Sequence, residues 1–195
     1  MQNKKINQYE GSGMRGHATL TQYKGIKDQA MLLDLHQGKK KFPDGIILVD
    51  KKNLIVDVGK INMAHLLGND PDAGAITHMA FGGTVTAGDT TTGTAPDSNQ
   101  YKLDNEIFRE PVIYTYDDGA PNFSVTFTAA ALANEHPAVD RIFEIGLTTN
   151  PIDPAAVAGD LDLFSRLSFP PIFFDASAPV SMGLVVDWEI IFEVI

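Results

Sequence analysis

The C-terminal segment, residues 183–195, alternates apolar and polar side chains, and this pattern constrains the fold more than any other in the chain. Every second residue is large and apolar: Leu184, Val186, Trp188, Ile190, Phe192 and Val194. The acids Asp187, Glu189 and Glu193 lie between them. A period of two is that of a β-strand with one face in a core. The pattern therefore predicts a strand that turns Trp188 and Phe192 into the protein interior.

A second alternating segment predicts a hairpin. Phe123, Val125 and Phe127 alternate with serine and threonine, and the polar turn at 117–119 separates them from an apolar run at 112–116. Phe127 is then a core residue. Shorter apolar runs predict further strands at residues 46–49, 54–56, 76–81, 141–147 and 163–169. Several strands separated by turn residues predict a mainly β protein, and we expect an antiparallel β-sandwich.

One short helix is expected at the edge of this sandwich, over residues 57–68. Val58, Ile61 and Leu67 recur at helical spacing. The carboxylate of Asp57 can cap the first turn, and Gly68 can end the helix in the left-handed conformation. Residues 26–36 predict a shorter helix.

The charge divides the chain into two parts. Residues 1–60 hold eleven of the fifteen basic groups against six acids, whereas the rest of the chain holds four against nineteen. Residues 1–45 have little core-forming pattern and predict an extended basic arm, ahead of a body over 46–195. Such an arm can dock on an acidic surface, including the body of a neighbouring copy. The alternative is a solvated tail of mixed charge.

Composition and motifs exclude several kinds of catalytic, metal and cofactor site. The absence of cysteine removes disulfides, zinc–thiolate sites and thiol catalysis. The five histidines form no metal-binding spacing, and the acids at 70–72 and 160–162 read as solvated loop residues rather than calcium ligands. No nucleophile elbow or phosphate-binding loop is present. We therefore expect no enzyme activity, no metal and no cofactor.

Charge and hydropathy also indicate whether the chain binds nucleic acid or a membrane, and where it is made. The acidic body disfavours nucleic acid as a partner. No apolar run is long enough to span a bilayer, and the polar N-terminus does not read as a signal peptide. We therefore expect no membrane partner and synthesis in a cytoplasm.

The arginines of the acidic body are candidates for structural ion pairs. Arg109 and Arg166 each stand in a mainly apolar or acidic run. The acids expected to pair with them are Glu106, Glu110 and Glu144. Guanidinium groups suit bidentate pairing with carboxylates, so we expect these residues to stabilise the sheet rather than to act on a ligand.

Five segments follow one another through the body of the chain: IVDVGKINMAHLLGN, ITHMAFGGT, LDNEIFREPV, FEIGL and LFSRLSFPPI, and the closing strand LVVDWEIIFEV follows them. In this order they resemble segments of the virion proteins of tailed bacteriophages, in particular the tail-collar and tail-fibre type of domain. The third is similar to a Leu-x-x-Glu-x-x-Arg element of these proteins, and the fifth to a Leu-x-x-Arg-x-x-Phe-Pro-Pro element. The resemblance covers about residues 54–195.

The resemblance implies a structural virion component, made in the host bacterial cytoplasm, without catalytic residues. Its partners would be copies of itself and other virion proteins. The chain has no repeat and no fibrous shaft, so a compact collar, tail, fibre-attachment or capsid-exterior protein fits better than a whole fibre. An alternative is a carbohydrate-binding module that recognises a host-surface glycan through Tyr101, Tyr114 and Tyr116. A hydrolase on a β scaffold is a third class, for which no pair of acids stands out.

Overall fold

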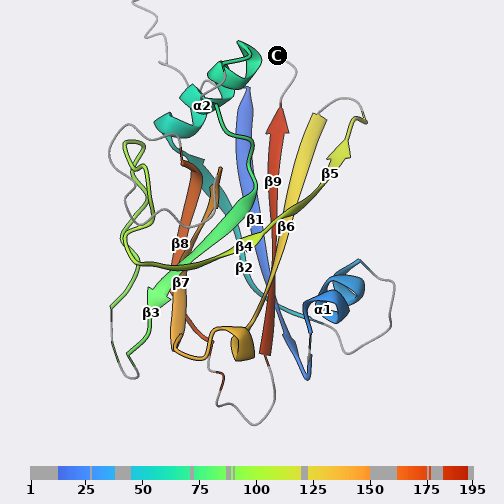
Figure 1. Ribbon diagram of the computed structural model, residues 1–195, viewed down its shortest axis with the longest axis vertical. Coiled ribbons are helices and arrows are strands. Elements are labelled where there is room, and N and C mark those ends of the chain that lie inside the picture. The colour runs from blue at the N-terminus through green and yellow to red at the C-terminus, as the bar shows by residue number, and fades with distance from the viewer. Residues whose placement is uncertain are drawn as a thin grey trace, which may run out of the picture.

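Nine antiparallel strands form one nearly closed, barrel-like sheet in the computed structural model (Figure 1). The structure describes residues 13–26, 28–37, 45–70, 73–86, 89, 91–119, 123–149, 162–174, 176 and 182–192. The strands are β1 (Met14–Lys24), β2 (Ile46–Ile55), β3 (His78–Thr84), β4 (Glu106–Pro111), β5 (Ile113–Asp117), β6 (Phe123–Leu132), β7 (Arg141–Thr148), β8 (Leu163–Phe173) and β9 (Met182–Phe192). The helices are α1 (Gln29–His36), α2 (Asp57–Leu67) and the short 3₁₀ helix η1 (Ala133–Glu135). The prediction of a mainly β, antiparallel protein is confirmed.

The sheet is continuous through β2. Its strand order is β4-β3-β7-β8-β2-β1-β9-β6-β5. Most of β2 pairs with β1, while Leu54 and Ile55 at its end pair with β8. The two halves that a sandwich would keep as separate sheets are therefore joined along one side. The two strands expected over residues 46–49 and 54–56 form one continuous strand, because β2 runs from Ile46 to Ile55.

The closing strand is confirmed as β9, and it lies at the centre of one half of the sheet between β1 and β6. Leu184, Val186, Trp188 and Ile190 are buried in the main core. Phe127, from β6, is buried opposite Trp188, and Phe192 is partly buried against the same core. Val194 and Glu193 lie outside the described residues. Val185, on the opposite face, is also buried, because α1 covers it.

The predicted arm differs from the structure over Met14–Lys24. This segment is β1, paired on one side with β2 and on the other with β9 along its whole length. The sheet thus begins before residue 46, and α1 also packs against it. Two of its inward residues are small: a Cβ on Gly16 would fall on the side chain of Asn53, and Ala18 lies opposite Trp188. Residues 1–12 of the predicted arm lie outside the described residues.

The apolar run at residues 46–49 was expected to be buried, and it is not. Ile46, Ile47 and Leu48 are exposed, and Val49 alone of the four is buried. This end of β2 pairs with β1 across a register shift between Leu20 and Thr21.

The helix α2 forms as predicted but packs through a different face. Ile61 and Leu67 are exposed, whereas Gly59 and Asn62 are buried. Gly59 allows α2 to approach β8, since a Cβ at this position would fall on the carbonyl oxygen of Phe164. Asn62 bonds the backbone of Gly74 twice, donating from Nδ2 at 2.7 Å and accepting at Oδ1 at 3.1 Å.

The ends of α2 also differ from expectation. Val56 is the N-cap, without a side-chain capping bond, and Asp57 stands in the first turn, where it pairs with Lys60. A carboxylate there still favours the positive end of the helix dipole. Gly68 has φ −79°, and Asn69, with φ 56°, takes the left-handed conformation instead. Asparagine tolerates that conformation better than most residues do.

Candidate functional site

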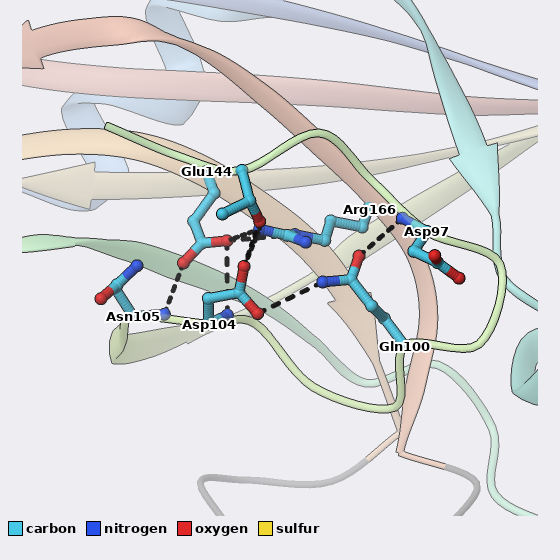
Figure 2. A network of polar contacts seen from close by, with 7 residues as sticks. Asp97, Gln100, Asp104, Asn105, Glu144 and Arg166 are labelled. Atoms are coloured by element: carbon cyan, nitrogen blue, oxygen red, sulfur yellow. Dashed lines mark hydrogen bonds and ion pairs between the residues drawn. The ribbon is translucent and has the colours of Figure 1, made fainter. Parts of the chain in front are cut away.

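Arg166 is the centre of a buried ionic network (Figure 2). Its side chain, from β8, is fully buried and bonds Glu144 of β7 through Nε at 3.0 Å and also through Nη2. Nη2 also lies 2.9 Å from Oδ2 of Asp104. Glu144 in turn accepts the backbone N–H of Asn105 at 2.6 Å. Two strands and one loop are thus held on a single guanidinium group.

The loop that precedes β4 is anchored by this network. Gln100 donates to Oδ1 of Asp104 at 3.2 Å and accepts from the N–H of Asp97, as Figure 2 shows. Burial raises the pKa of Asp104, but the hydrogen bond from Thr94 and the charge of Arg166 outweigh it, so that this pKa lies below its ordinary value. The carboxylate therefore stays ionised and keeps the loop on the sheet.

Arg109 forms a second buried cluster, with two carboxylates. From β4 it bonds Glu106 through Nε at 2.6 Å and Nη2 at 3.0 Å, and Asp162 through Nη1 at 2.9 Å and Nη2 at 2.6 Å. Burial acts against the charge of Arg109, yet the bonds to Glu106 and Asp162 outweigh it and raise the pKa of the guanidinium. Asp162, expected to be a solvated loop acid, is buried and joins the start of β8 to β4.

Glu110 lies apart from both arginine clusters. Its Oε1 is 2.6 Å from Nε2 of His136, and its Oε2 accepts from Gln29 of α1 at 2.9 Å. The ring of His136 stacks on Phe108, with centroids 3.6 Å apart. Glu110 therefore joins α1 to β4, a role that its place in the sequence does not show.

Of the five predicted ion-pair residues, the structure brings Arg109 to Glu106 and Arg166 to Glu144, and leaves Glu110 with a histidine. Sequence reasoning missed Asp104 and Asp162, which are the second acid of each cluster. Their positions depend on how loops cross the sheet, which no local pattern shows.

An apolar groove lies between α2 and the β5–β6 hairpin, with a volume of about 590 Å³. Phe127, Phe164 and Ile190 are its buried lining residues. Its exposed lining residues are Leu66, Ala75, Tyr114, Tyr116 and Phe123, together with the acids Asp117 and Asp118. A concave, mainly apolar surface with a few polar groups at its rim is typical of a binding site.

Two of the three tyrosines predicted to bind sugar line this groove. Tyr114 and Tyr116 project from the same face of β5 and meet edge to face, with ring centroids 5.4 Å apart. Tyr101 is not among the lining residues and lies beside Lys102 instead. Two of the predicted tyrosines therefore line the groove, and Phe123 and Phe192 line it with them.

The two kinds of site differ in what they can do. The carboxylates of the arginine clusters are paired with guanidinium groups, and these pairs join strands and loops of the sheet to one another. The groove can bury apolar or aromatic groups. Within the described ranges, no three His, Asp or Glu side chains gather as metal ligands would.

No helix in the described part of the chain is long and apolar enough to cross a membrane.

Comparison of the chain with protein-family models, with curated proteins and with solved structures finds no match in any of the three.

Proposed function

We propose that the chain is a structural component of a tailed-bacteriophage virion, which assembles there with copies of itself. The observation that carries the proposal is the mutual contact of the residues on which the resemblance rests. Glu106 and Arg109 of one motif pair with each other, and Glu144 and Arg166 of two others do the same.

The apolar residues of these motifs support the same proposal. Leu103 and Leu163 belong to one buried cluster, and a Cβ on Gly146 would fall 2.7 Å from a methyl group of Leu163 and 3.1 Å from one of Leu103. Motif residues that contact one another inside the protein serve the fold. This is what we expect where a family preserves a scaffold rather than a reaction.

The test is the protein content of assembled particles. We expect mass spectrometry of purified virions, from the phage that encodes this chain, to detect it at a fixed copy number. A compact collar, tail, fibre-attachment or capsid-exterior protein remains attached when particles are purified. The chain's absence from particles that contain their other structural proteins would refute the proposal.

A second candidate function is glycan recognition at the groove. The observation that favours it is the pair of exposed rings at Tyr114 and Tyr116, because sugars stack on aromatic faces beside carboxylates such as Asp117 and Asp118. We expect any glycan bound on an array to be lost by Tyr116→Ala and kept by Tyr101→Ala. A chain that binds no glycan of its host surface would remove this candidate.

A further inference from the structure

The groove between α2 and β5 exposes more aromatic surface than an isolated subunit needs. Tyr116 is 74% exposed, Tyr114 57% and Phe123 47%, and all three line it. Leu66 of α2, 41% exposed, faces the same space. Contiguous exposed apolar surface beside charged groups marks a place where another chain binds.

The strand that borders the groove is an open edge. Among the described strands, β5 stands last in the sheet order and pairs only with β6. All five of its residues are exposed. Exposed edge strands are commonly protected by lysine, proline or a bulge, but Ile113–Asp117 contains no lysine or proline, and its pairing with β6 has no register shift. An edge strand next to an apolar groove can accept an added strand, with backbone bonds for affinity and the groove for side chains.

Residues 1–12 are attached at this end of the sheet. Met14, the first residue of β1, lies opposite Phe192 of β9, and Phe192 lies opposite Phe123 of β6. Both phenylalanines line the groove. Each subunit therefore carries at least twelve residues that start beside a groove, and twelve residues can reach about 40 Å.

The composition of this segment suits the groove. It contains Lys4 and Lys5, which complement Asp117 and Asp118 at the rim. It also contains Ile6 and Tyr9, whose apolar groups can enter a space lined by aromatic rings. The two lysines outnumber the one acid of the segment, Glu10, so its net charge is opposite to that of the rim and its apolar residues match the lining.

We propose that residues 1–12 of one copy bind in the groove of a neighbouring copy and add to the edge of β5. The proposal rests on the self-assembly in the proposed function and names the contact that produces it. Within one chain the segment would have to cross about 19 Å of sheet, from β1 over β9, β6 and β5, before it could add to the free edge of β5. Exchange between identical copies avoids this crossing and gives each groove one occupant.

Disulfide trapping tests the contact directly, because the chain contains no cysteine of its own. We would mix full-length Ile6→Cys protein with Tyr116→Cys protein carrying a size tag, and oxidise the mixture. The expected product is a cross-linked pair of one tagged and one untagged chain, and its yield should fall several-fold at high salt as screening weakens the lysine–aspartate attraction.

The matched control replaces Tyr116→Cys by Lys51→Cys, an exposed position on β2, and should give no such pair above background. Equal yields with both partners would overturn the proposal. So would a double variant, Ile6→Cys with Tyr116→Cys, that closes its disulfide within one chain at every protein concentration, since the segment would then occupy its own groove.

Removal of residues 1–12 provides an independent measurement. The shortened chain retains every described strand, so we expect an unchanged far-ultraviolet circular dichroism spectrum and a smaller assembly by light scattering. An assembly of undiminished size would overturn the proposal and point to direct pairing of β5 edges. A chain found in virions without the cross-link would refute this contact alone, whereas a cross-link in a chain absent from virions would refute the proposed function alone.

Discussion

At the scale of single residues, Trp188 has the largest fully buried side chain of the described core. Its indole Nε1 has no hydrogen-bond partner among the described residues, so the side chain contributes through packing rather than through a polar contact. We expect Trp188→Ala to lower the free energy of unfolding by about 3–5 kcal/mol, since it removes apolar contacts and leaves a cavity.

The matched variant is Trp188→Phe, which keeps a ring and removes the unpartnered N–H. Trp188→Phe should lower the free energy of unfolding by clearly less than Trp188→Ala does. Denaturant unfolding of both proteins measures the difference, and the single tryptophan makes fluorescence a direct probe of this position in the wild type. Equal, small losses for both variants would mean that the site is not tightly packed.

The Arg166–Glu144 pair belongs to the same scale. Glu144→Leu leaves a fully buried guanidinium whose remaining described ion-pair partner is the half-exposed Asp104, and we expect a loss of about 3–5 kcal/mol in the free energy of unfolding. The double variant Glu144→Leu with Arg166→Met removes both charges and should cost less than either single change. A thermodynamic cycle with no coupling between the two positions would contradict the buried pairing.

Asp104 gives the network a pH dependence. Its pKa is lower in the folded protein than in the unfolded chain, so its stabilising effect is present above the ordinary aspartate value of about 3.9 and is lost as the pH falls through the folded value. Asp104→Asn should therefore be less stable than the wild type at pH 7. The difference between the two proteins should shrink below about pH 4, as chemical denaturation at several pH values would show.

At the scale of elements, the contact of α2 with β8 depends on Gly59. Alanine is favoured over glycine in a helix by about 1 kcal/mol, yet we expect Gly59→Ala to destabilise the protein by about 1–3 kcal/mol, because the new methyl group meets the backbone of Phe164. Lys60→Ala, exposed on the same helix, should change stability by less than about 0.5 kcal/mol. Thermal unfolding of both variants separates the packing effect from helix propensity.

The elements also show what the sequence could predict. The closing strand and the β5–β6 hairpin were predictable, because large apolar residues alternate in both. The strand β1 was missed, because two of its inward positions, Gly16 and Ala18, are small and interrupt the hydrophobic alternation between Met14 and Leu20. Their size makes sense only once the partner strand is known.

In the candidate site, too, some contacts could be predicted from the sequence and others could not. Glu106 and Arg109 stand three residues apart, so a pair between them could be expected from sequence. Asp162 reaches Arg109 from fifty-three residues away, and nothing local marks it. The groove was half predictable, since the tyrosines of β5 alternate on one face, but the position of α2 opposite them follows from its packing through Gly59.

At the scale of the whole molecule, the first and last described strands are neighbours, blue β1 beside red β9 in Figure 1. Met14 pairs with Phe192 at one end of this ladder. We expect a circular permutant, with a short linker joining the two ends and new termini in the exposed turn at 117–119, to keep the circular dichroism spectrum of the parent. Loss of folded structure in the permutant would mean that the chain order, and not only the strand pairing, is needed for folding.

The place of β9 between β1 and β6 has a consequence for synthesis on the ribosome. Of the described strands, β1 is made first, yet one of its two neighbours is made last, about 160 residues later. Until β9 leaves the exit tunnel, both β1 and β6 keep one side of their backbone unpaired, and the core residues that pack against Trp188 and Ile190 stay uncovered. A nascent chain in this state can pair with its neighbours on a polysome. Yield in the cell should therefore depend on chaperone capacity and translation rate more steeply than the stability of the finished protein would suggest.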